Sequence, residues 1–248
     1  MRIFIVLFIN ALVVMAGISA VAEEPTEQAE RALAQFQKIA KQKDNWKRLG
    51  LKSTADIGNV QLGAPMRVHM VRLDHLKEFK PGKGDPNELI RAVDQYIYPM
   101  VLERRAQASF YIEKIKGEWK ATGFGSQKLS QMAARVRQVV AKSKRVAEKD
   151  ISIVQIPALN LYFLAYQAEI TKPTARKATS IKQATSIKQA TSIKQATSIK
   201  QATSIKQWML TPLIDDASFG FKAGRTMRAA DVLRKILPTA QKLKDLPT

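Results

Sequence analysis

The chain has 248 residues, no cysteine, and a formal net charge of +20 that comes from 41 Lys and Arg against 21 Asp and Glu. The lack of cysteine excludes disulfide bonds, thiol catalysis, cysteine-ligated zinc and lipoprotein modification. The positive charge attracts anions in general, such as phospholipid headgroups, lipopolysaccharide or nucleic acid, and does not choose among them.

Residues 1–22 have the three-part pattern of a signal peptide. Arg2 gives a positive start, an apolar run begins at Ile3, and small residues lead to an A-x-A site that ends at Ala22. This pattern predicts cleavage after Ala22 and a periplasmic or secreted protein. The alternative is an uncleaved anchor, because about 20 apolar residues span a bilayer. No second apolar run approaches that length, so we expect no transmembrane segment in the mature chain, and export makes nucleic acid an unexpected partner.

The first elements of the mature chain read as helix, strand and helix. We expect an N-terminal helix within residues 23–50, capped by Thr26 and continuing through Arg48. Apolar and polar residues alternate over residues 66–73, which predicts a strand. Asp85 is a natural cap before Pro86, and the spacing of apolar residues predicts a helix from there to about residue 97.

The middle and end of the chain contain the clearest strand and helix signals. Three apolar-rich runs within residues 98–124 predict a three-stranded meander, and residues 126–147 have the 3–4 spacing of an amphipathic helix. Further strands are expected at residues 151–156, 159–170 and 208–214, and a last helix after Thr226. Residues 51–248 are therefore predicted to form a single α+β domain, a mostly antiparallel sheet with helices packed on one face.

Two stretches carry a resemblance to known proteins. "LGAPMRVHMVRLDHL" contains a Gly-x-Pro strand, and "YPMVLERRAQASFYIEKIKGEWKATGFG" contains a Tyr-Pro strand and a W-x-x-x-x-x-G hairpin. Together they resemble a pattern that recurs in uncharacterised exported bacterial proteins, and the meander is similar to cystatin-like and PepSY-like α+β modules. The resemblance covers residues 58–126. It implies a protein that binds or inhibits rather than catalyses, and it assigns no functional residue.

Residues 178–207 are the tandem repeat ATSIKQ, written five times. In a helix, successive isoleucines would lie about 120° apart, so no apolar face would form. In a strand, each face would carry one isoleucine in three positions, which is little apolar surface for the cost of ordering the backbone. We therefore expect residues 172–207 to be a low-complexity insertion between two strands, in the place of a hairpin loop. A hexapeptide β-helix is the alternative.

The polar side of the predicted 126–147 helix is a candidate anion-binding face. Its basic residues include Lys128, Arg135, Arg137, Lys142 and Arg145. Lys128, Arg135 and Lys142 recur every seven residues and so line up along the helix. A solvated surface of a helix that packs on the core explains the same pattern, and both interpretations stay open.

The sequence contains no assembled catalytic set. The only histidines, His69 and His75, lack the spacing of metal ligands, and we expect no metal and no cofactor. We predict an exported, non-enzymatic protein that binds another protein or an anionic envelope component. One alternative is a hydrolase whose site combines His69, His75, Ser126 and Asp216. A second alternative is electrostatic association with anionic envelope surfaces.

Overall fold

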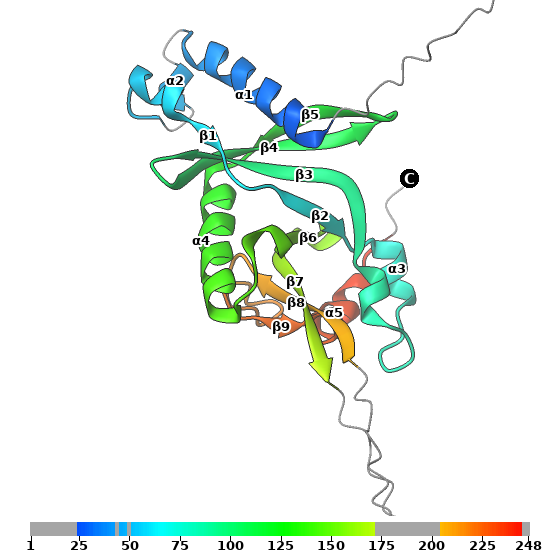
Figure 1. Cartoon of the computed structure of the whole chain (residues 1–248). Helices are drawn as coiled ribbons and strands as arrows, with labels where there is room; N and C mark the ends of the chain where they lie inside the picture. The colour runs from blue at the N-terminus through cyan, green and yellow to red at the C-terminus, as the bar shows by residue number, and fades with distance from the viewer. Residues whose placement is uncertain (1–23, 43–44, 49–50, 172–203, 245–248) are drawn as a thin grey trace, which may run out of the picture.

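A computed structural model describes residues 24–42, 45–48, 51–171 and 204–244 (Figure 1). Its centre is a nine-stranded sheet. Eight strands follow the order β5-β4-β3-β2-β6-β7-β8-β9, and the ninth, β1, pairs with β3. The pairs are antiparallel except for β2 with β6, which run parallel. The helices surround this sheet, so the predicted α+β fold with a mostly antiparallel sheet is confirmed.

The elements have the following bounds. The helices are α1 (Pro25–Ala40), α2 (Asn45–Arg48), α3 (Leu73–Glu78), α4 (Gln127–Lys144) and α5 (Ala229–Ala240). The strands are β1 (Gln61–Leu62), β2 (Met66–Met70), β3 (Arg91–Leu102), β4 (Arg105–Ile115), β5 (Glu118–Gly125), β6 (Ser152–Ile156), β7 (Leu161–Thr171), β8 (Ser204–Pro212) and β9 (Met227–Arg228). Two short 3₁₀ turns used below are η2 (Pro86–Leu89) and η3 (Glu148–Asp150).

Helices cover both faces of the sheet, so the expectation of helices on one face is wrong. In β4, Phe110 packs in the cluster that contains α1, whereas its neighbour Tyr111 packs in the cluster that contains α4. In β6, Val154 packs with α5 and its neighbour Ile153 packs with α4. Because neighbouring residues of a strand point to opposite faces, α1 and α5 lie on one face and α4 lies on the other (Figure 1).

The predicted helix over residues 85–97 is also wrong beyond its first turn. Asp85 does cap a turn, since its side chain accepts a hydrogen bond from Asn87 N–H at 2.9 Å, but that turn is only η2. From Arg91 onward the chain is β3, which pairs with both β2 and β4. Pairing with two partner strands outweighs the helical spacing of the apolar residues here.

The other elements were predicted more closely. Residues 98–124 form the meander, in which β3 continues through β4 into β5. Ser126 caps α4 by accepting a hydrogen bond from Leu129 N–H at 3.2 Å. The N-terminal helix differs from the prediction because α1 begins at Pro25 and ends at Ala40. The hydroxyl of Thr26 lies 2.9 Å from that of Tyr98, so Thr26 ties α1 to β3 and is not a cap.

The repeat meets the sheet at the β7–β8 hairpin. The predicted insertion over residues 172–207 lies outside the described residues, except for its last four positions. These four, Ser204 to Gln207, complete the fifth repeat copy and begin β8, which pairs with β7 from Thr171–Ser204 to Phe163–Pro212. The flanking strands therefore form a hairpin, as expected, and the second strand begins four residues earlier than predicted.

Candidate functional site

A groove of about 470 Å³ lies between α4 and the connection from β8 to β9. Its volume falls within the range of small-molecule sites, about 300–1,000 Å³. α4 supplies one wall, through Lys128, Met132, Arg135, Val136 and Val139. The connection supplies the other, through Leu213, Ile214, Asp215, Ala223 and Gly224.

The interior of the groove is apolar and open to solvent. The α4 residues recur at spacings of three and four, so they form one stripe along the helix. At the end of this stripe Val139 is 53% exposed, and on the opposite wall Ile214 is 39% exposed. Large apolar side chains that are exposed together around one hollow are typical of a binding surface.

The wall opposite α4 is held by its own hydrogen bonds. Asp216 and Phe221 exchange backbone hydrogen bonds of 3.0 and 2.8 Å. The Asp215 carboxylate accepts from Ala223 N–H at 2.7 Å and from Lys222 Nζ at 3.3 Å. The Ala223 N–H, and next the Lys222 ammonium, lower the pKa of Asp215. Asp215 is therefore an ionised residue that stabilises the turn, and this wall of the groove is held by hydrogen bonds within the protein.

The candidate anion-binding face divides into three parts. Lys128 and Arg135 line the groove, and neither has a salt-bridge partner among the described residues. Lys142 and Arg145 are exposed beyond the groove, and Arg145 ends α4 with a φ of 54°. Arg137 does not belong to this face, because it is only 4% exposed.

Arg137 instead clamps three segments of the fold together. Its guanidinium donates to the backbone oxygens of Ala64 at 2.6 Å, Pro65 at 3.1 Å and Glu148 at 3.1 Å. These oxygens belong to the β1–β2 connection and to η3. Burial lowers the pKa of Arg137, but a guanidinium keeps its charge at any ordinary pH.

The four residues of the hydrolase alternative lie on different elements. Ser126 caps α4, and the Asp216 carboxylate accepts from Ser218 N–H at 2.9 Å within its own turn. His75 lies in α3, and His69 lies in β2. In the described part of the chain no hydrogen bond joins any two of these four side chains, so the structure does not bring them together as a catalytic set.

His69 is a buried core residue. It is 8% exposed, its ring lies 4.8 Å from that of Trp208, and its Nδ1 has no hydrogen-bond partner among the described residues. Burial, and next the charge of Arg67, lower the pKa of His69 to about 4. The imidazole is therefore neutral at neutral pH and lies against the core on the α5 face.

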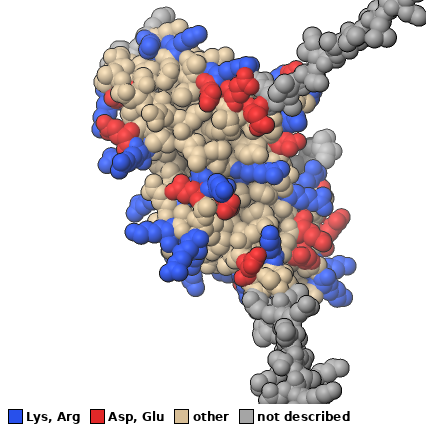
Figure 2. Space-filling view, in the orientation of Figure 1, with Lys and Arg blue, Asp and Glu red and all other residues tan. Residues whose placement is uncertain are grey.

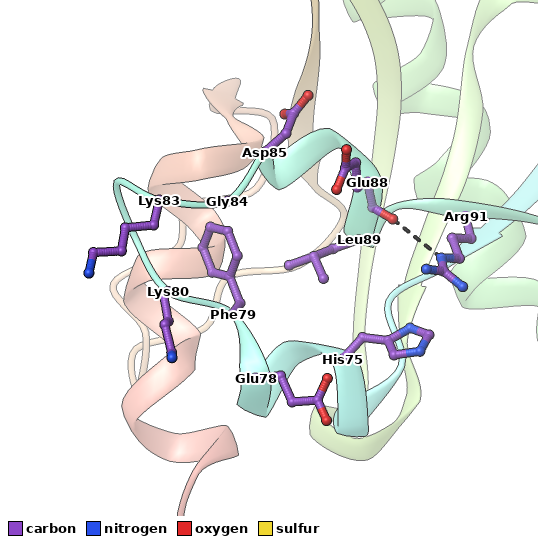
Figure 3. Close-up of a pocket in the computed structure, with 10 residues that line it drawn as sticks. All are labelled: His75, Glu78, Phe79, Lys80, Lys83, Gly84, Asp85, Glu88, Leu89 and Arg91. Carbon is purple, nitrogen blue, oxygen red and sulfur yellow. Dashed lines mark hydrogen bonds between the residues drawn. The ribbon is translucent and has the colours of Figure 1, made fainter.

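A second hollow, of about 430 Å³, lies beside α3 and η2 (Figure 3). Figure 3 shows Phe79 and Leu89 toward its interior, while Lys83 and Asp85 point away from it. Arg91 Nε donates to the backbone oxygen of Glu88 at 3.4 Å. The charged groups do not converge on one point, so this hollow lacks the arrangement of a catalytic or ion-binding site.

The described residues contain no metal-ligand cluster, and the face drawn in Figure 2 has no continuous basic patch. Among the residues 24–42, 45–48, 51–171 and 204–244, no three His, Asp or Glu side chains are grouped to hold a metal ion. Figure 2 shows basic and acidic side chains interspersed on the face in view. Within these same ranges, no helix combines the length and the apolar character that crossing a bilayer requires.

The groove itself was not predicted from the sequence. Met132, Val136 and Val139 were expected on the apolar side of the 126–147 helix, packed on the core, whereas Val139 is 53% exposed, so this apolar side is wider than the sheet covers. That excess was the available signal for a groove. Comparison of the chain with protein-family models, with curated proteins and with solved structures finds no match.

Proposed function

We propose that this chain is an exported, non-enzymatic binding protein, and that the groove beside α4 receives the apolar part of a small ligand. The observation that supports the proposal is that Val139 and Ile214 are both exposed, on opposite walls of one groove. Their exposure has a free-energy cost in water that a ligand with an apolar body would remove.

Two properties of the groove support binding rather than catalysis. The wall after β8 is fixed by the bonds of Asp215 and Asp216, so little ordering is needed when a ligand enters. The polar groups on the groove are Lys128, Arg135 and Asp215, and the last is occupied by its own turn. A nucleophile paired with a base is not among the groups that line this groove.

Export is the second part of the proposal, and it rests on the signal pattern of residues 1–22. Cleavage after Ala22 would leave α1 complete, because α1 begins at Pro25. The mature protein, recovered from a periplasmic extract or from the medium, should begin at Glu23 by N-terminal sequencing. Recovery of the chain from the membrane with residue Met1 still in place would support the anchor alternative instead.

The binding function is tested with N-phenylnaphthylamine, a neutral apolar dye whose fluorescence rises in dry surroundings. We expect the mature protein to enhance its fluorescence, and Val139→Gln or Ile214→Gln to abolish most of the enhancement. Ile39→Gln is the matched control, since Ile39 is 50% exposed but lies on α1, away from the groove lining. Equal loss in the Ile39 variant would contradict the proposal.

A further inference from the structure

We infer that the groove binds a monomeric single-chain amphiphile with a carboxylate head, of the kind represented by a medium-chain fatty acid. This inference rests on the proposed function and names the chemistry of the ligand. Three properties of the groove lead to it: its apolar lining, the position of its cations, and its limited size.

The apolar lining selects one hydrocarbon chain. Met132, Val136 and Val139 line the groove from α4, and Leu213 and Ile214 line it from the other side. All of these side chains are aliphatic or thioether, which suits a flexible acyl chain, and none is aromatic. The volume of about 470 Å³ is at the smaller end of the range for ligand sites, so it suits one chain better than two.

Both cations on the groove come from α4 and are spread along it. Lys128 is in the first turn of α4, Arg135 lies two turns later, and Val139, one turn beyond Arg135, marks the far end of the lining. α4 contains no Asp or Glu, and the positive end of its dipole is also at the Lys128 end. The helix dipole and Lys128 orient the ligand, with its carboxylate toward the N-terminal end of α4, Arg135 alongside it, and its chain toward Val139.

One acidic group lies on the groove, and its charge is already balanced. The Asp215 carboxylate pairs with Lys222 and accepts the Ala223 N–H. Lys128, Arg135 and Lys222 thus stand against a single carboxylate, and the net local charge is positive. An anionic head is therefore attracted to this groove, and a cationic head would have no free carboxylate to bind.

A free ligand fits the groove better than a membrane does. Helices that insert into the membrane interface usually present bulky Trp, Phe or Leu side chains. The groove side of α4 presents Met132, Val136 and Val139, and the fold partly covers the first two of these. Only Val139 and Ile214 protrude, which is enough to cover one chain and too little to anchor the protein.

The experiment titrates the mature protein with sodium decanoate, decanol and butanoate, and measures displacement of N-phenylnaphthylamine. We expect decanoate to bind about tenfold tighter than decanol, because two cations attract its head. Butanoate should not displace the dye, because its chain is too short to fill the groove. Added salt should weaken the binding of decanoate and leave the binding of decanol unchanged.

Matched variants assign the effect to the groove. The double variant Lys128→Gln/Arg135→Gln should reduce decanoate binding to the level of decanol. Lys142→Gln is the control, since it removes a positive charge from the same line of α4 without touching the groove. If Lys142→Gln weakens decanoate as much as the double variant, general charge and not the groove attracts the ligand, and the inference is wrong.

The remaining outcomes separate this inference from the proposed function. Equal affinity for decanoate and decanol, lost in Val139→Gln, would overturn the carboxylate and keep the apolar groove. Absence of dye binding would overturn both. Sedimentation of the protein with vesicles of phosphatidylglycerol and phosphatidylcholine, unchanged in Val139→Gln and without decanoate binding, would overturn the inference and favour electrostatic association with anionic surfaces.

Discussion

The two faces of the sheet each bury a basic side chain, and the hydrogen bonding of the two side chains differs. On the α4 face, Arg137 donates to three backbone oxygens from distant segments. On the α5 face, His69 lies against Trp208 and its Nδ1 has no partner among the described residues. A guanidinium cannot lose its charge in a protein, so it is buried only with acceptors. An imidazole can release its proton, so it can be buried neutral.

This difference determines when each residue affects stability. The Arg137 clamp should stabilise the fold at every ordinary pH, because its charge and its acceptors are constant. His69 should destabilise the fold more at acid pH than at neutral pH, because at acid pH the unfolded chain binds a proton that the folded chain rejects.

The largest effect is expected from Arg137→Leu. Leucine fills part of the space, but it leaves the partly buried oxygens of Ala64, Pro65 and Glu148 without their donor. We expect the free energy of unfolding in urea to fall by about 3 kcal/mol, the cost of losing hydrogen bonds to a charged group and leaving acceptors unpaired. Arg137→Lys should recover only part of the lost free energy of unfolding, because an ammonium lacks the planar set of N–H donors that a guanidinium has.

Arg135→Leu is the matched control for the clamp. It removes the same group from the same helix, but Arg135 is exposed. Its effect on the free energy of unfolding should stay within about 0.5 kcal/mol. If the Arg137 and Arg135 variants lost equal stability, the hydrogen bonds of the clamp would contribute nothing beyond general charge.

The second effect concerns the pH dependence caused by His69. Its pKa is about 4 in the folded chain, against 6.5 for an unperturbed histidine, which is the value that applies to the unfolded chain. A histidine with a lowered pKa contributes stability that is complete above about pH 6.5 and is lost as the pH falls toward 4. His69→Phe removes this linkage, so the variant should gain up to about 3 kcal/mol relative to the native protein over that interval.

Urea unfolding at several pH values measures the gap between the two proteins. His75→Gln is the control, because His75 lies in α3 and is only partly buried. The variant at position 75 should follow the native pH profile. A constant gap between native protein and His69→Phe across the interval would show that His69 titrates alike in both states, and the contrast with Arg137 would fail.

A third effect tests how the α5 face is closed. The Asn87 side chain accepts from Trp208 N–H at 3.0 Å and donates to the Lys206 oxygen at 3.3 Å, so it ties η2 to β8. Asn87→Ala should cost about 1–2 kcal/mol, since both backbone groups lose a partner. Asn59→Ala is the control: its one bond, to the Ala55 oxygen, is exposed and local. Calorimetry should show a much smaller shift of the melting temperature for Asn59→Ala than for Asn87→Ala.

Local features of this fold could be predicted from the sequence, and non-local ones could not. The helix that follows Ser126 depends on residues three and four apart, and it was predicted. The burial of Arg137 depends on acceptors 72 and 73 residues away, which no local pattern reveals. The same reason explains the error at residues 85–97, where pairing of Gln95 with Glu113 decides in favour of a strand.

The candidate site follows the same rule. The α4 wall of the groove has a helical spacing, and its apolar residues and two cations were identified from that spacing. The wall after β8 follows from the path of the sheet, because it depends on where β8 and β9 pair. The repeat lies between these two cases. Its six-residue period is even, so it is compatible with a strand, but only the pairing with β7 shows that the end of the fifth copy lies in one.

The smallest effect is expected from shortening the repeat. Deletion of residues 178–201 removes four copies and leaves the fifth, so Ser204 to Gln207 can still pair with β7. Thr171 pairs with Ser204, so the ends of the connection are already held together. A shorter connection should therefore raise the free energy of unfolding by no more than about 1 kcal/mol. Calorimetry of the mature protein measures this change.

Deletion of residues 178–207 is the matched comparison, since it removes the paired copy as well. Ala168, Glu169 and Ile170 then lose their partners in β8, and Asn87 loses the Lys206 oxygen. This variant should be less stable than the four-copy deletion by about 1 kcal/mol, because several strand hydrogen bonds lie at the exposed end of the hairpin. Equal melting temperatures of the two deletion variants would mean that the last copy stabilises the fold no more than the four copies before it. Any sequence could then replace the beginning of β8.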